Sequence, residues 1–213
     1  MTDSQLASDW LALIRSRRSI RRFVPEPLPP PTLERLLTAA AWAPSAHNRQ
    51  PWRFAVITQP PTKERLARAM GVRLRADRLA DGDSLEAVEQ DAARSHARIA
   101  GAPVVIAACL TMADMDRYPD ERRQAAERLM AVQSVAMAVQ NFLLAAHAEG
   151  LGACWMCAPL FCPDVVRDAL GLPEDWEPQA LITLGYPAIA TPGNRRGKPA
   201  ERKPLQKVVL WGE

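Results

Sequence analysis

The segment from Leu129 to Ala148 constrains the fold most, because it is apolar on nearly every side of a helix. Its polar residues Gln133, Gln140 and His147 recur every seven positions, so they form one narrow stripe. Such a helix is buried on most faces, either centrally or in a subunit interface. The interrupting polar residues argue against a membrane span. We therefore interpret His147 as a core or interface histidine rather than a catalyst.

The rest of the chain alternates helices with a few strands. The apolar runs at 104–108 and 180–184 predict buried central strands. Residues 71–95 are rich in Arg and Asp and weakly periodic, so we expect an exposed helical lid over 71–100. Helices are predicted at 4–16, 31–42, 61–70, 84–100, 120–148 and 162–170, and strands at 53–58, 103–110, 152–158 and 179–186.

Length and charge narrow the class of protein. A chain of 213 residues suits one domain, here 1–213 with a C-terminal tail from 187 to 213. A net charge of +3 is too small to argue for nucleic-acid or membrane binding. Residues 6–18 form an amphipathic pattern rather than a signal peptide, so a cytoplasmic location is expected.

The four cysteines are interpreted as structural. Cys154 and Cys157 have the spacing of a redox pair or of two zinc ligands, and Cys162 lies close by. A structural zinc site needs four ligands, and no fourth Cys or paired His stands at the required spacing. Cys109 and Cys154 lie in apolar runs, where free cysteine behaves as a small hydrophobe. No metal site is therefore predicted, and the thiol redox pair is the alternative.

The loop between the second helix and the first strand is unusually polar. Pro44 stops the helix, and five side chains able to form hydrogen bonds follow within six positions, namely Ser45, His47, Asn48, Arg49 and Gln50. Turn chemistry accounts for Pro44, Ser45 and Asn48 but not for polarity that continues to Gln50. Loops of this kind between rigid elements favour a binding site.

A second cluster follows the first helix, with five arginines between Arg15 and Phe23. Guanidinium groups and the Ser19 hydroxyl suit a phosphate, whereas the helix dipole alone also favours cations at a helix end. A third basic group lies in the tail, at Arg195, Arg196, Lys198, Arg202 and Lys203. Two such clusters from opposite ends of a domain could converge on one phosphate.

These residues resemble a known family. The segment 17–23 is similar to its Arg-Arg-Ser-x-Arg-x-Phe element, and 44–52 to its Pro-Ser-x-x-Asn-x-Gln-Pro-Trp element. Gly150-Leu151-Gly152, Leu184-Gly185-Tyr186-Pro187 and Arg202-Lys203-Pro204-Leu205 follow in the same order. The chain thus resembles the FMN-dependent nitroreductase family over almost its whole length.

The resemblance implies an α+β fold, with a central mixed sheet surrounded by helices, in an intertwined homodimer. FMN would lie at the subunit interface, NADH or NADPH would donate hydride, and a small-molecule electron acceptor would then be reduced in the same cleft. The resemblance assigns cofactor binding to Arg17, Arg18, Ser19, Ile20, Arg21, Pro44, Ser45, Ala46, Asn48, Gln50, Ala158, Pro159, Leu160, Arg202 and Lys203.

In these assignments Arg17, Ser19 and the tail cations would hold the phosphate. Arg21 would face the pyrimidine edge of the flavin, where a cation stabilises the reduced form. The chain departs from the family at Pro159-Leu160, where relatives carry Glu-Gly, and proline has no amide hydrogen. The Leu160 amide, or that of Ala158, is expected to reach the hydride-accepting nitrogen of the flavin.

The acceptor is left open among nitroaromatic, quinone and flavin-like compounds. Trp155 and the predicted lid also resemble the flavin-binding C-terminal domain of the enzyme that matures a deazaflavin coenzyme. That alternative would make the protein a reductase of a dehydro precursor, with Arg73 and Asp77 on the lid meeting the substrate. An alternative of another class is a non-catalytic flavin- or phosphate-binding module.

Overall fold

The computed structural model describes residues 3–188 and 201–212. Arg195, Arg196 and Lys198 of the predicted basic tail lie outside these residues. The helices are α1 (Asp3–Ser16), α2 (Pro30–Ala41), α3 (Pro60–Ala80), α4 (Leu85–Ala100), α5 (Glu121–Ala148) and α6 (Pro163–Leu170). The strands are β1 (Trp52–Ile57), β2 (Val104–Leu110), β3 (Gly152–Met156) and β4 (Glu177–Gly185), and short 3₁₀ turns lie at Ala46–Asn48, Ala158–Phe161 and Leu205–Lys207.

The four strands form one sheet in the order β1-β2-β4-β3, and each neighbouring pair is antiparallel. The sheet was expected to contain both parallel and antiparallel pairs. Among the described residues, the parallel pairing is one isolated bridge, between Ser19 and Ala153. The α+β class is confirmed, and β2 and β4 are the buried central strands that the apolar runs predicted.

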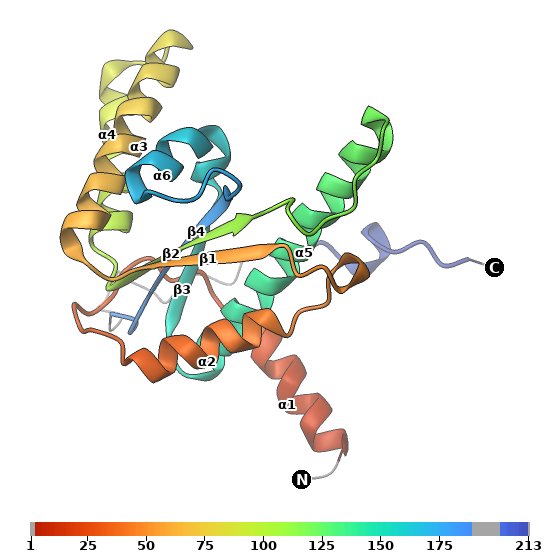
Figure 1. Cartoon of the computed structure of the whole chain (residues 1–213). Helices are drawn as coiled ribbons and strands as arrows, with labels where there is room; N and C mark the ends of the chain where they lie inside the picture. Colours follow the sequence, from red (N-terminus) through yellow and green to blue (C-terminus); the bar gives the residue numbers. More distant parts are fainter. Residues whose placement is uncertain (1–2, 189–200, 213) are drawn as a thin grey trace.

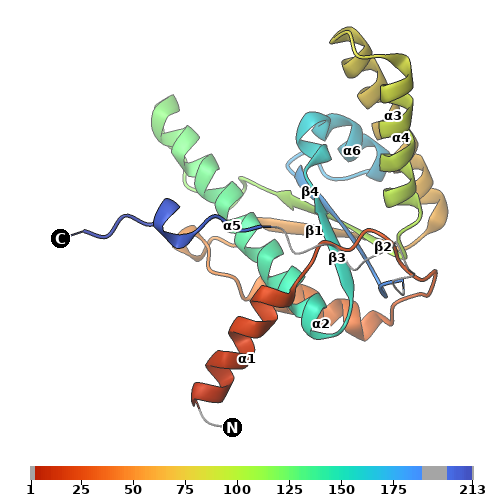
Figure 2. The same ribbon diagram turned by 180° about the vertical axis from the view of Figure 1, so that it is seen from behind.

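Helices cover both faces of the sheet (Figure 1). On β2, Val104 and Ile106 face one core with α2 and α5, while Val105 and Ala107 face a second core with α3, α4 and α6. This alternation follows from the two-residue period of a strand. The long α5 runs across one face of the sheet (Figure 2), as its all-round apolar sequence predicted.

Within the described residues, α5 is long and apolar enough to cross a membrane by length and composition alone. Its buried residues include Ala138, Val139 and Phe142, which pack in the sheet core. The helix α5 therefore forms part of the core.

The end of α3 differs from the prediction. A helix was expected at 61–70, but α3 continues to Ala80 and pairs with α4 as a helical hairpin that rises from the sheet (Figure 1). Gly71 lies inside the helix, where glycine is unfavourable but tolerated. Ion pairs on the hairpin, such as Arg75 with Glu89, join the two helices where apolar periodicity is weak.

Candidate functional site

The arginine-rich segment lies along β3, at one edge of the sheet. The amide of Ile20 donates to the carbonyl of Ala153 at 3.0 Å, beside the parallel bridge between Ser19 and Ala153. Gly152 makes this approach possible, because a Cβ built there would stand 2.7 Å from Cγ2 of Ile20. The residues from 17 to 21 are therefore held in place by backbone contacts, which leaves polar side chains to act on a ligand.

Positive charge gathers around Cys154 on β3. Burial raises the pKa of the Cys154 thiol, and the charges of Arg21, Arg98 and Arg17 oppose that shift. Arg98 comes from the last turn of α4, so the hairpin contributes to the same neighbourhood as the 17–21 segment. Arg98 could not be identified from the sequence, because nothing in the pattern of α4 separates it from the other exposed arginines there.

Arg18 has a different role from its neighbours. Its Nη1 donates to the carbonyls of Arg15 at 2.7 Å and Arg17 at 2.8 Å. The bond to the Arg15 carbonyl caps the end of α1, where the helix dipole favours a cation. The Arg18 side chain thus binds the backbone of its own segment and helps to fix its conformation.

The polar loop before β1 has an unusual backbone. His47, Asn48 and Gln50 have φ values of 50°, 54° and 50°. The left-handed region costs an ordinary L-residue roughly 1–2 kcal/mol, and asparagine somewhat less. Such strain persists only where surrounding contacts fix the conformation, and it clusters at functional sites.

Side chains fix this loop from both ends. The Gln50 amide donates to Oγ of Ser45 at 3.0 Å, and the Ala46 amide donates to Oγ of Ser134 on α5 at 3.2 Å. The Gln50 side chain turns toward Asn48, with its Nε2 3.3 Å from the Asn48 Oδ1. The two side-chain amides are therefore placed next to each other on an exposed turn.

The two polar clusters lie at opposite corners of the sheet. β1, which follows the 44–50 loop, is one edge strand, and β3, which carries the 17–21 segment, is the other. Trp52 of β1 pairs with Leu110 of β2, which in turn pairs with Glu177 at the start of β4. Ala153 of β3 pairs with Leu184, near the other end of β4. Three strand spacings give about 14 Å across, and seven residues give about 24 Å along the strands. One copy of the chain does not bring the clusters together.

The turn after β3 carries Ala158, Pro159 and Leu160. The Leu160 amide donates to the Cys157 carbonyl at 3.0 Å, so it closes the 3₁₀ turn. Ala158 is the first residue of that turn, a position whose amide has no acceptor within the helix. Of the two amides predicted to face a flavin, that of Ala158 is the better placed.

One of the two predicted lid residues, Arg73, is held in an ion pair. Arg73 donates to Asp164 at the start of α6 at 2.8 Å, and this bond lowers the pKa of the Asp164 carboxyl. Asp77 lies near enough to Arg73 to act on its charge. The structure thus ties Arg73 to α6, where the sequence analysis placed it against a substrate.

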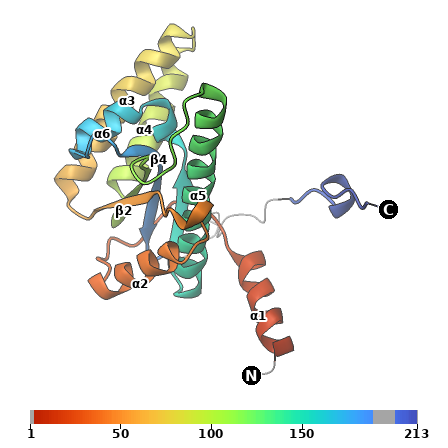
Figure 3. The same cartoon turned by 45° about the vertical axis from the view of Figure 1, so that its right-hand side comes forward.

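The C-terminal segment from 201 to 212 extends beyond the body of the molecule (Figure 3). Arg202 and Lys203 are exposed, and so are the apolar side chains of Leu205, Leu210 and Trp211. Within this copy the segment does not pack into either core.

The sequence of the chain matches the model of the nitroreductase family over residues 14–186. The chain belongs to the nitroreductase family. The match covers both polar clusters and all four strands, so the family resemblance seen in the motifs is confirmed.

Individual nitroreductase-family relatives agree over almost the whole chain. An NADH dehydrogenase of Thermus thermophilus is 33% identical and covers 92% of both chains. A crystal structure described as a nitroreductase in complex with FMN, from Desulfovibrio desulfuricans, is 29% identical, with a TM-score of 0.70 and 96% of both chains covered. The NADPH:FMN oxidoreductase of Vibrio harveyi, at 21% identity and a TM-score of 0.70, shares the fold over 96% of this chain and 77% of its own.

The cysteines of this nitroreductase-family chain are mostly core residues. Cys109, Cys154 and Cys162 are buried, and burial raises the pKa of Cys109 to about 12. The core interpretation of Cys109 and Cys154 is confirmed. Cys157 is exposed, and its sulfur accepts from Nε1 of Trp155 at 3.1 Å.

Proposed function

We propose that the protein is an FMN-dependent oxidoreductase that takes hydride from NADH or NADPH and reduces a small aromatic or conjugated acceptor. The observation that carries this proposal is the placement of two binding clusters at opposite corners of one sheet. A second copy of the chain, related by a two-fold axis, would bring one cluster from each copy to a shared cleft. The FMN-bound and NADH-dependent relatives support the cofactor and the donor.

The donors on the β3 side fit FMN. Arg17 and Ser19 offer a charged fork and a hydroxyl for a phosphate, and Arg202 and Lys203 of the tail add cations. Arg21 lies by Cys154, further along β3, where it would meet the pyrimidine edge of the ring. Ile20 is positioned by Gly152 and would supply backbone packing beneath the cofactor.

A homodimer is supported by the apolar surface that one copy leaves uncovered. None of the residues of α1 is buried, although Leu6, Trp10 and Ile14 are large and apolar. The Trp42 side chain is 83% exposed. A groove of about 350 Å³ runs between α1, α2 and α5, lined by Trp10, Leu13, Ala39, Trp42, Asn141, Leu144, Ala145 and Ala148. Patches of this kind are typical of subunit interfaces.

The chain's own groups would orient the reactants and set the electrostatics of the cleft. Bound FMN supplies the redox chemistry, by accepting a hydride from the nicotinamide and delivering it to the acceptor. Arg21 would stabilise negative charge on the pyrimidine edge, and the Ala158 amide would donate to the ring. Pro44, Ser45, Ala46, Asn48 and Gln50 of the second copy would close the other wall and exclude water.

The acceptor class is proposed from the surroundings of the cleft. Leu160 and Phe161 are 52% and 78% exposed in the turn after β3, and they offer an apolar surface for a flat ring. The deazaflavin-precursor alternative is not confirmed by the relatives described above. It also depended on Arg73, which is paired with Asp164. A non-catalytic module is disfavoured because the named relatives are oxidoreductases. A cytoplasmic location is retained as part of the proposal.

Absorbance spectroscopy of the purified protein tests the proposal. Bound flavin should give a yellow protein whose absorbance bleaches on adding NADH or NADPH without oxygen and returns on adding a quinone or a nitroaromatic compound. Steady-state kinetics should be ping-pong, because donor and acceptor use one cleft in turn. A protein that cannot take up FMN, or that holds FMN unbleached by either nicotinamide, would overturn the proposal.

A further inference from the structure

The loop from Ser45 to Gln50 is fixed by contacts that its own motif does not provide. Arg49 forms an ion pair with Asp116, which lies in the connection between β2 and α5. Arg53 pairs with Asp114 of the same connection at 3.0 Å, and its Nη1 also donates to the Gln50 carbonyl at 3.2 Å. One ion pair therefore joins the left-handed loop directly to the neighbouring segment, and a second joins it through Arg53 of β1, which donates to the loop's last carbonyl.

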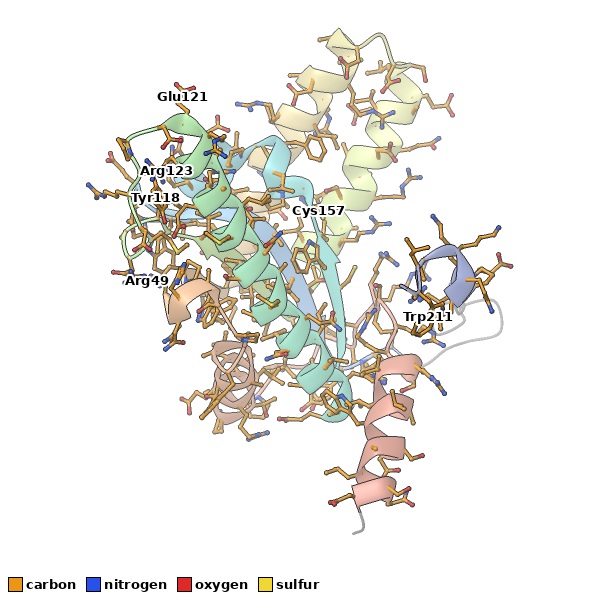
Figure 4. The ribbon with its side chains drawn as sticks, turned by 90° about the vertical axis from the view of Figure 1, so that its right-hand side faces the viewer. Arg49, Tyr118, Glu121, Arg123, Cys157 and Trp211 are labelled. Carbon is orange, nitrogen blue, oxygen red and sulfur yellow. The ribbon has the colours of Figure 1, made fainter. Side chains whose placement is uncertain are left out.

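That neighbouring segment is in turn fixed by α5. The Asp116 amide donates to Oε1 of Glu127 at 3.1 Å, and the Tyr118 amide donates to Oε1 of Gln124 at 2.9 Å. In Figure 4, Arg49 and Tyr118 lie on the same side of the molecule, next to the first turns of α5. The backbone of residues 116–118 is thus fixed by two side chains spaced three positions apart on one helix face.

Glu127 is an unusual residue for this task. It is fully buried, and within the described part of the chain its Oε2 has no hydrogen-bond partner. Burying a carboxyl group is costly unless the group is paired or hydrogen-bonded. Its Oε1 accepts from the amide of Asp116, the residue whose carboxylate pairs with Arg49.

We propose that Glu127 and Asp116 are positioning residues that hold the Arg49 side chain and thereby keep the 45–50 loop in its left-handed form. The order of action runs from Glu127 on α5, through the backbone and carboxylate of Asp116, to the guanidinium of Arg49. Preorganisation of this loop matters because Asn48 and Gln50 form one wall of the flavin cleft in the proposed function, on which this last consequence depends. The same contacts give Arg49 a role that the family motif leaves undefined.

Hydrogen exchange at two amides reports directly on whether the loop is formed, with or without flavin. The amides of Ala46 and Gln50 donate to Ser134 and Ser45, so they are protected only while the loop is formed. Arg49→Gln and Asp116→Asn should each lower their protection roughly two- to fivefold, as expected for an exposed ion pair. The double variant should lose no more than either single one, and Arg49→Asp with Asp116→Arg should restore protection.

Glu127 is tested by two substitutions that separate its hydrogen bond from its charge. Glu127→Gln keeps an acceptor for the Asp116 amide, so loop protection should be retained. Glu127→Leu removes the acceptor and should lower protection by no more than the same two- to fivefold, because its effect on the loop passes through the ion pair of Asp116 with Arg49. Protection of the Val105 and Leu181 amides in the central strands reports the overall fold in each variant. Where the loop opens in an appreciable fraction of molecules, FMN affinity should fall by that fraction.

The matched control is Glu149→Gln, which breaks the ion pair of Glu149 with Arg35 of α2 at the far end of α5. It should leave the Ala46 and Gln50 amides unchanged. Unaltered protection in Arg49→Gln, Asp116→Asn and Glu127→Leu, with the central strands intact, would overturn the positioning role. So would equal loop loss in the control. A wild-type protein that fails to bind FMN would overturn the proposed function, and the hydrogen-exchange result would stand separately.

Discussion

The Ser16 hydroxyl lies 2.8 Å from Nε2 of His147 and joins the end of α1 to the end of α5. The same hydroxyl also donates to the Leu13 carbonyl at 3.1 Å. The tautomer of the His147 ring decides which of the two groups donates in the contact between them. This bond fixes α1 immediately before the arginine-rich segment.

Removing this bond should loosen α1. We expect His147→Ala to lower the free energy of unfolding by about 1 kcal/mol, the usual net value of one hydrogen bond. His147→Gln can still donate and should lose less. Thermal unfolding of both variants, with circular dichroism at the helix band, measures the difference. Equal losses in the two variants would mean that packing rather than the hydrogen bond holds the helix end.

A methyl group at Gly152 should displace the arginine-rich segment. The added Cβ meets Ile20 at 2.7 Å, so Gly152→Ala should cost about 1–3 kcal/mol and weaken FMN binding. Gly71→Ala is the matched control, because its Cβ meets only the end of the Arg75 side chain at 3.1 Å inside helix α3. That variant should be stabilised by roughly 0.5–1 kcal/mol. Fluorescence titration with FMN and chemical denaturation check both. Undiminished FMN affinity in Gly152→Ala would contradict the docking of segment 17–21 on β3.

Much of the architecture could be predicted from local patterns. The apolar run of α5 and the two runs that become β2 and β4 each need burial on both sides, and the structure places them in the core. The hairpin of α3 and α4 was harder to predict, because α3 after Gly71 is held by ion pairs and has little apolar periodicity. The strand order could not be predicted, because the pairing of β4 between β2 and β3 depends on long-range packing.

The same limit applies to the candidate site. The motifs identified Arg17, Ser19 and Asn48 by residue type, but only the strand order places them at opposite corners. The Arg73–Asp164 pair joins residues 91 positions apart, so no local pattern indicated that Arg73 forms an ion pair. Arg98 likewise reaches Cys154 only because the hairpin returns the chain to the sheet.

The ion pair between Arg73 and Asp164 of α6 should make the stability of the fold depend on pH in the acidic range. The hydrogen bond from Arg73 lowers the pKa of Asp164 below its ordinary value of 3.8. A carboxyl group with a lowered folded-state pKa stabilises the fold above its ordinary value and loses that contribution as pH falls through the lowered one. Wild type should thus exceed Asp164→Asn in stability at neutral pH, and the gap should close below the ordinary pKa. A gap that is constant from neutral to strongly acidic pH would contradict the ion pair.

Thiol labelling should separate the four cysteines. Cys157 is exposed, whereas burial raises the pKa of Cys109, Cys154 and Cys162. An aromatic disulfide reagent should therefore modify one thiol of the flavin-free native protein quickly and the other three only after unfolding. Cys157→Ser should abolish the fast phase. A fast phase that survives in that variant would mean that a thiol on β3 or α6 is open to solvent.

Subunit complementation tests the central claim most directly. Arg17→Ala with Ser19→Ala disables the β3 side, and Asn48→Ala with Gln50→Ala disables the loop side. If each cleft takes one wall from each copy, both variants should be nearly inactive alone. Unfolding and refolding them together should restore about a quarter of wild-type activity, because half of randomly paired dimers hold one intact cleft. A mixture no more active than the two variants apart would contradict the shared cleft.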